Sequence, residues 1–100
     1  MYGLMQTDIE YIKQALSQFT DIKKAIIFGS RAHGNYKKGS DVDLAICGEE
    51  ISDNTVYNLN DLLNEVYPLP YFFDLLHYEH INNEYLLEHI NTEGKVIYIR

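Results

Sequence analysis

The stretch FGSRAHGNYKKGSDVDLAI, residues 28–46, places a Gly-Ser pair after an apolar segment and two aspartates, one residue apart, in the next. Asp41 and Asp43 flank Val42, and Leu44 follows them. Alternate side chains of a strand point to opposite faces of a sheet, so the two carboxylates share one face and the apolar side chains take the other. Like charges this close repel each other, and the rest of the chain has to supply what compensates them.

A third aspartate stands in a later apolar run. Asp74 lies within YFFDLLHY, residues 71–78, and no Lys or Arg stands within a few positions of it. An isolated ionised carboxylate in such surroundings is strongly disfavoured unless a counter-charge is near. Magnesium prefers oxygen ligands and is usually held by one or two carboxylates plus substrate phosphates. If the third strand pairs near the second, Asp41, Asp43 and Asp74 form a site for metal ions, and two such ions suit an in-line displacement.

The Gly-Ser pair supplies a candidate phosphate site. Gly29 ends a strand and lets the backbone approach a bulky anion closely. If the segment after Ser30 turns helical, its free N–H groups and the Ser30 hydroxyl face a phosphate. Arg31, Lys37 and Lys38 bring cations near the same place. A phosphate cradle combined with metal-binding carboxylates indicates nucleotidyl transfer.

Length and hydrophobic patterning predict one domain over residues 1–100. The fold class expected is α/β (α+β), a mixed β-sheet with helices packed on one side. A possible capping box of Thr7 and Glu10 starts the first helix, and Gly94 ends the last one. The expected strands are 24–28, 41–46, 71–78 and 96–99. Between the first helix and the last, we expect a short helix or loop around 31–36 and a helix capped by Ser52, Asp53 or Asn54, whose inward residues are Val56, Leu59, Leu62, Leu63 and Val66. The last helix is capped by Asn82 or Asn83.

Composition narrows the classes of function. The chain has 15 acidic and 8 basic residues, a formal net charge of −7, which argues against direct binding to nucleic acid because phosphate neutralisation dominates such binding. Cys47 is the single cysteine, so neither an intrachain disulfide nor a cysteine-cluster metal site is possible. The chain has no apolar run of membrane-spanning length and no secretory signal, so we expect no membrane association and a cytoplasmic location.

These motifs together resemble a known family. Gly29-Ser30, ten intervening residues and then Asp41-Val42-Asp43 are similar to the signature of the DNA polymerase β-type nucleotidyltransferase superfamily. Within it, the small size and FGSRA-x-G…GSDVDLAI resemble the minimal nucleotidyltransferases (MNT domains), including the MntA-like antitoxins. The tail INTEGKVIY, residues 90–98, also fits, and the resemblance covers about residues 24–98.

The resemblance implies a role for each matching residue. Gly29 and Ser30 would bind the triphosphate of ATP, and Arg31 and Ser40 are further candidates for nucleotide contacts. Asp41, Asp43 and Asp74 would be both catalytic and metal-ligating, with two Mg²⁺ ions, and Asp74 would also help to activate the attacking hydroxyl.

The resemblance also implies a partner. Such proteins pair with a HEPN-domain toxin in type VII toxin–antitoxin systems, where the MNT protein can transfer AMP to a tyrosine of the HEPN ribonuclease. The two proteins would then form a hetero-oligomer. The acceptor of the AMP group stays open at this point.

Other interpretations stay open from the sequence alone. The aspartate pair can be a solvated strand start, Asp74 can form a structural ion pair, and Gly29-Ser30 can be an ordinary turn. The antitoxin can act by masking the toxin without catalysis, or the enzyme can modify a small molecule of the aminoglycoside type. His33 stands where the family often has arginine, which puts a titrating group beside the phosphate loop. No segment obviously forms an adenine pocket, so we expect a partner subunit to complete the site.

Overall fold

Four strands form one mixed sheet in the computed structural model, which describes residues 1–37 and 39–100. The strands are β1 (Lys24–Phe28), β2 (Val42–Cys47), β3 (Phe73–His77) and β4 (Lys95–Ile99). Their order across the sheet is β3-β2-β1-β4. β1 is antiparallel to both β2 and β4, whereas β3 runs parallel to β2. The mixed sheet expected from the sequence is confirmed.

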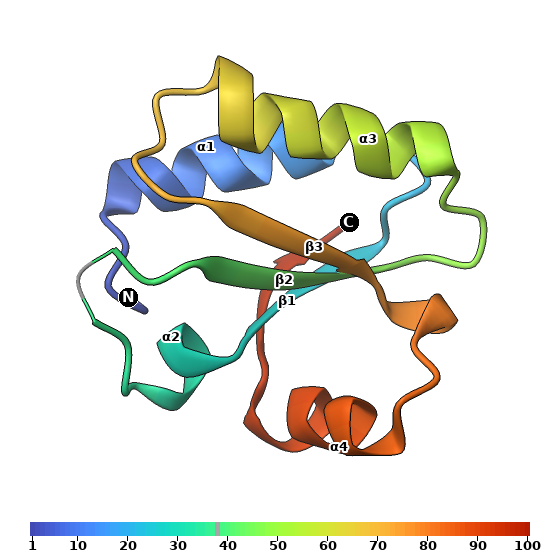
Figure 1. Ribbon diagram of the computed structural model, residues 1–100. Helices are drawn as coiled ribbons and strands as arrows, with labels where there is room; N and C mark the ends of the chain where they lie inside the picture. Colours follow the sequence, from blue (N-terminus) through green and yellow to red (C-terminus); the bar gives the residue numbers. More distant parts are fainter. Residues whose placement is uncertain (38) are drawn as a thin grey trace.

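Two long helices cover one face of the sheet, as Figure 1 shows. They are α1 (Gln6–Ser17) and α3 (Asp53–Asp61), and a π-helical turn, η1 (Leu62–Val66), continues α3. Apolar side chains from alternate strand positions meet the apolar stripes of these helices, as period-2 and period-3.6 patterns require. The fully buried members of this core include Ile12, Leu16, Ile27, Val42, Leu44, Ile46, Leu59, Leu63 and Phe73.

A further helix, α4 (Glu84–Glu93), packs against the opposite face (Figure 1). A second, smaller core forms there, in which Ile90 of α4 packs with Ile26, Phe28, Ala45 and Cys47. The expectation that helices pack on one side therefore holds for α1 and α3 but not for α4. The physical reason is that β1 and β2 are apolar at odd and even positions alike, so both of their faces need cover.

Two shorter helices complete the fold. α2 (Ser30–His33) follows β1 directly, and η2 (Tyr78–His80) is a single 3₁₀ turn after β3. The described helices include none with the length and apolar character to cross a membrane.

The helix caps agree with the sequence for α3 and α4. The Ser52 hydroxyl accepts a hydrogen bond from the Thr55 N–H at 3.1 Å. The Asn83 side chain accepts one from the Leu86 N–H at 3.1 Å, so Asn83 rather than Asn82 is the cap. Each bond satisfies an amide that the first turn of a helix leaves free.

The expected capping box of Thr7 and Glu10 is wrong. The helix begins at Gln6, and the Asp8 carboxylate accepts the Met5 N–H at 3.0 Å. Asp8 is buried, and the Tyr71 hydroxyl also donates to it at 2.8 Å. A carboxylate that satisfies a helix amide and a distant phenol at once is better placed than an exposed Glu10.

The π-helical turn shifts the apolar face of the segment after α3. The Tyr67 N–H donates to the Leu62 carbonyl at 2.8 Å, five residues back instead of four. Leu63 stays fully buried, but Val66, expected to face inward, is 58% exposed. Asn64, within the same turn, bonds the backbone of β3 with its side chain.

Candidate active site

The parallel pairing of β2 and β3 brings two of the three aspartates together. Asp43 is the register partner of Asp74, so both side chains leave the sheet on the same face. This is the face of Ala45 and Cys47, on which α4 packs farther along the strands. Asp41 lies one residue before the start of β2. The condition under which the three carboxylates would meet, pairing of the second and third strands, is thus fulfilled.

The three carboxylates interact electrostatically. Asp43 is half-buried, whereas Asp41 and Asp74 are exposed. The pKa of Asp43 is raised above its ordinary value of 3.8, first by burial, then by the charge of Asp74, and then by the charge of Asp41. Each cause disfavours the ionised form, so a cation bound among these groups would relieve both the desolvation and the repulsion.

Gly29 sits directly against this cluster. Its φ of 73° and ψ of −152° fall in a region that essentially only glycine occupies. A Cβ atom at Gly29 would lie 2.5 Å from Oδ2 of Asp43, closer than atoms can approach. The preceding residue, Phe28, is the register partner of Asp43 across β1 and β2. The missing side chain therefore lets the turn from β1 into α2 run beside the carboxylate.

The three carboxylates are chemically suitable ligands for magnesium, but they do not surround an ion by themselves. Among the described residues, no group of three or more His, Cys, Asp or Glu side chains is arranged to hold a metal ion by itself. The candidate ligands Asp41, Asp43 and Asp74 are all carboxylates, the donors that magnesium uses together with water and substrate phosphates. Oxygens of a bound triphosphate would have to complete the coordination.

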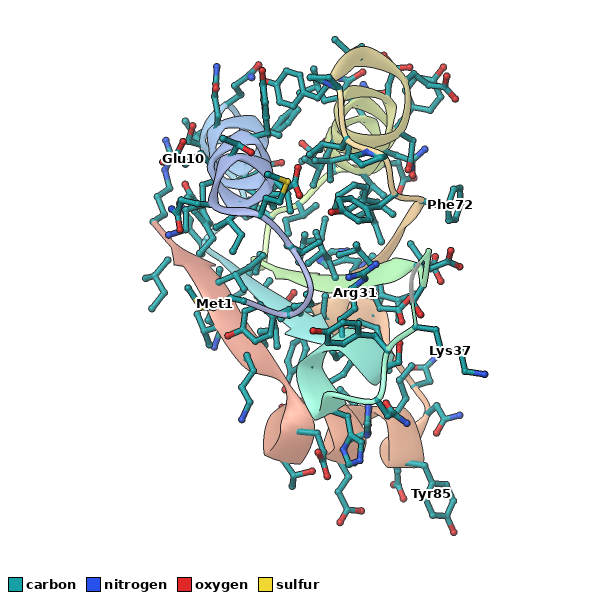
Figure 2. The ribbon with its side chains drawn as sticks, turned by 90° about the vertical axis from the view of Figure 1, so that its left-hand side faces the viewer. Met1, Glu10, Arg31, Lys37, Phe72 and Tyr85 are labelled. Atoms are coloured by element: carbon teal, nitrogen blue, oxygen red, sulfur yellow. The ribbon has the colours of Figure 1, made fainter. Side chains whose placement is uncertain are left out.

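Arg31 lies inside the protein, where its guanidinium donates to backbone carbonyls. It is 3% exposed, and Figure 2 shows it at the level of the sheet, below the two long helices. Its Nε and Nη2 both donate to the carbonyl of Ser40, at 3.1 and 2.8 Å. The Ser40 hydroxyl accepts the Lys37 N–H at 2.8 Å. In this arrangement Arg31 and Ser40 bond to each other and to the connecting loop.

The other basic side chains after the Gly-Ser turn lie at the surface or outside the described residues. Lys37 points away from the protein in Figure 2, and Lys38 lies outside the described residues. His33 is exposed, and its Nδ1 is 2.9 Å from Oε2 of Glu93 in α4. The hydrogen bond and charge of His33 lower the pKa of Glu93. The sequence position of His33 gave no sign of this pairing, because Glu93 belongs to a distant helix.

A cavity of about 360 Å³ opens beside the Gly-Ser turn. Gly29, Ser30 and His33 line one side of it, and His89 and Glu93 of α4 line the other. The ring of His89 meets that of Phe28 edge-on, with centroids 6.5 Å apart. No local signal in the sequence predicts that α4 brings His89 to this cavity.

Comparisons with known proteins agree on the fold. The family model described as polymerase beta nucleotidyltransferase matches residues 10–100. A solved structure described as a toxin–antitoxin with AMP-PNP is 20% identical and superposes with a TM-score of 0.75, covering 92% of this chain and 73% of that one. A mutant MntA–HpeT toxin–antitoxin is 17% identical with a TM-score of 0.72, covering 97% of this chain and 75% of that one.

An archaeal protein is also similar. A putative nucleotidyltransferase from Sulfolobus solfataricus is 19% identical with a TM-score of 0.53, covering 98% of this chain and 92% of that one. No curated protein matches the sequence significantly. At these identities the solved structures establish the fold, and the family model covers nine-tenths of the sequence. The chain belongs to the polymerase beta nucleotidyltransferase family.

Proposed function

We propose that this protein is a magnesium-dependent nucleotidyltransferase that moves AMP from ATP to a tyrosine hydroxyl of a HEPN ribonuclease toxin, and so acts as the antitoxin of a type VII pair. The observation that carries the proposal is the register of Asp43 with Asp74 on one face, with the Gly29 turn against Asp43. Similarity to structures described as toxin–antitoxins, one of them with AMP-PNP, supports the class of partner and of nucleotide.

The transfer is a displacement at the α-phosphorus of ATP. The oxygen of the acceptor hydroxyl forms a bond to that phosphorus while the bond from phosphorus to the bridging oxygen breaks, and pyrophosphate leaves. The hydroxyl proton goes to Asp74, which is exposed at the edge strand and open to an incoming partner. When bound, magnesium ions would neutralise the triphosphate and stabilise the attacking and leaving oxygens.

The other residues of the site would bind the metal ions and the triphosphate. Asp43, already crowded by like charges, would hold the metal ions together with Asp41 and Asp74. Gly29 and Ser30 would hold the triphosphate beside that cluster, because Gly29 has no side chain that would separate the turn from Asp43. Ser30 also lines the 360 Å³ cavity, which has room for phosphate groups. We propose that the HEPN partner completes the nucleotide site and that residues 1–100 act as one minimal nucleotidyltransferase domain.

A labelling experiment tests the proposal. The protein is mixed with the product of its neighbouring gene, Mg²⁺ and ATP labelled at the α-phosphate, and the label on each protein is measured. We expect label on the partner, loss of label with Asp41→Asn, and retained label with Asp61→Asn, which changes an exposed carboxylate on α3.

The competing function is neutralisation by contact alone. In that case the partner carries no label, yet it stays bound and inactive with wild type and with Asp41→Asn alike. That result would overturn the enzymatic proposal and keep the antitoxin role. Label on a small molecule in place of the partner would overturn the choice of acceptor.

A further inference from the structure

We propose that Asn64 and Arg31 are positioning residues that set the separation of the site carboxylates, each by holding the peptide bond that leads into one of them. Asn64 holds the carbonyl of Phe73, the residue before Asp74. Arg31 holds the carbonyl of Ser40, the residue before Asp41. The inference rests on the proposed function, because it concerns how the same site is held in shape.

Asn64 acts on β3 as a neighbouring strand would. Its Nδ2 donates to the Phe73 carbonyl at 3.1 Å, and its Oδ1 accepts the Phe73 N–H at 2.7 Å. One side-chain amide thus satisfies both backbone groups of a single residue on the outer edge of the sheet. Nδ2 also donates to Oδ1 of Asn60, at 2.9 Å, which fixes the orientation of the amide.

Asn64 makes this contact from within the π-helical turn η1, directly after α3. π-Helical turns are rare in proteins, and those that do occur are often found at functional sites. Phe73 itself is fully buried, so its side chain and its backbone are both fixed immediately before Asp74. Asp74 is exposed and could not be fixed by packing of its own side chain.

Arg31 performs the equivalent task for the segment that carries Asp41. Besides the two bonds to Ser40, its Nη1 donates to the Tyr2 carbonyl at 3.0 Å. The guanidinium lies 5.4 Å from the ring centroid of Tyr36 and 4.9 Å from that of Tyr71. A planar group with several donors, held between two rings, keeps the loop that ends at Asp41 against α2.

We call the hydrogen bonds of Asn64 to Phe73 and of Arg31 to Ser40 the two tethers, and Tyr71 connects them. Its ring packs on Arg31, its hydroxyl donates to Asp8 at the start of α1, and its chain leads into β3 two residues before Phe73. The three segments that carry the Gly-Ser turn, Asp41 and Asp74 are therefore linked by partly buried contacts of Arg31, Tyr71 and Asn64 and by the chain between Tyr71 and Phe73. Partners that hydrogen-bond metal ligands directly change metal affinity about 10- to 100-fold when they are replaced, and we expect a change in the same direction from residues that hold the backbone beside the ligands.

The test measures metal binding without turnover. Mn²⁺ affinity is measured by electron paramagnetic resonance with a non-hydrolysable ATP analogue, and exchange of the Phe73 amide by NMR. We expect Asn64→Leu, which keeps the size and removes both bonds, to weaken Mn²⁺ binding at least about tenfold and to expose the Phe73 amide to exchange. Asn64→Asp keeps the acceptor and loses the donor, so it should protect the amide yet still weaken Mn²⁺ binding.

Two matched controls separate positioning from general destabilisation. Ile12→Val loosens the buried core at α1 at a residue that takes no part in the tether hydrogen bonds, and Asn58→Leu makes the same chemical change on the exposed face of α3. Both should keep wild-type Mn²⁺ affinity. Arg31→Lys keeps the charge but cannot bond two carbonyls in a fixed fork, and it should weaken Mn²⁺ binding as Asn64→Leu does. High Mg²⁺ should partly restore transfer to both tether variants.

The outcomes are separable. Wild-type Mn²⁺ affinity in Asn64→Leu and Arg31→Lys would overturn the tethers while leaving the proposed function standing. An equal loss in Ile12→Val would also overturn them, since the effect would then come from stability. Wild-type protein that binds no Mn²⁺ with nucleotide would overturn the proposed function, and the inference with it.

Discussion

Gly29 is the residue at which backbone conformation and site chemistry depend on each other most directly. Replacing it by alanine adds a Cβ in a glycine-only backbone region and 2.5 Å from Oδ2 of Asp43. We expect Gly29→Ala to lower the free energy of unfolding by about 2 kcal/mol or more and to abolish transfer. Urea unfolding and the labelling assay measure the two effects.

Gly34 provides the matched control for this change. It also has a positive φ, 100°, but no atom would lie within 4 Å of an added Cβ. Gly34→Ala should therefore show only the backbone cost, about 1 kcal/mol, and keep its activity. Equal losses of stability and activity in the two variants would mean that the contact with Asp43 plays no part.

Asp43 couples the site to stability through pH. Its folded pKa is raised by burial, Asp74 and Asp41, so the folded protein binds this proton more tightly than the unfolded chain does. The contribution of Asp43 to stability therefore falls as pH rises from 3.8 through the raised pKa, and it stays unfavourable above that window. Asp43→Asn should accordingly raise the unfolding temperature at pH 7 while it abolishes transfer.

The control for this prediction is to measure the effect of Asp43→Asn on the melting temperature at two pH values. The stabilisation by Asp43→Asn should shrink as pH falls below 3.8, where wild-type Asp43 is protonated in both states. Thermal melts at pH 7 and pH 3.5 measure it, with Asp61→Asn as an exposed carboxylate that should show no such gain. A lower melting temperature for Asp43→Asn at pH 7 would contradict the prediction.

At the scale of elements, α4 is the helix whose role differs most from the sequence-based expectation. It seals the face of the sheet that also carries the carboxylates, and Ile90, 1% exposed, is its buried contact. Ile90→Ala should lower the free energy of unfolding by about 2–5 kcal/mol, as large-to-small changes in a core do. Ile99, 72% exposed on β4, is the control, and Ile99→Ala should change the free energy of unfolding by less than about 0.5 kcal/mol. Similar effects of the two changes in urea unfolding would show that α4 does not seal the sheet.

Elements with strong local patterns were predictable, and their tertiary consequences were not. Strand β1 was predicted with its observed bounds, and Ser52 was named as a helix cap, because both depend on neighbours in the sequence. Val66 was expected to face inward because a periodicity argument assumes a regular helix, which the π-helical turn interrupts. The hydrogen bond from Arg31 to the Ser40 carbonyl could not be predicted from the sequence either, because the burial of Arg31 depends on segments far apart in the chain.

For the candidate site, the sequence named three carboxylates, and the structure shows how the strands place two of them. Spacing placed Asp41 and Asp43 on one face, and the structure then supplied the register that sets Asp74 beside Asp43. Alternation is a local property of a strand, whereas a pairing between strands so far apart in the sequence is not. The roles of these residues stay predictions until transfer and metal binding are measured.

At the scale of the whole molecule, we expect the net charge of −7 to make nucleotide binding dependent on metal. A free triphosphate is repelled by an acidic protein, and the cluster of Asp41, Asp43 and Asp74 concentrates that repulsion where the phosphates would bind. We therefore expect ATP alone to leave the melting temperature unchanged and ATP with Mg²⁺ to raise it. At a ligand concentration 100 times Kd the stabilisation is about 2.7 kcal/mol, which raises the melting temperature by roughly 11–22 °C for a domain of this size.

Thermal melts with a non-hydrolysable analogue of ATP test this dependence directly. Chelation of Mg²⁺ by EDTA should return the melting temperature to that of the free protein. Asp41→Asn should reduce the shift and Asp61→Asn should preserve it, because only the former changes the proposed metal site. A full shift with the nucleotide in the presence of EDTA would mean that the Gly29–Ser30 turn and the basic side chains bind the triphosphate unaided, and the carboxylates would then need a different explanation.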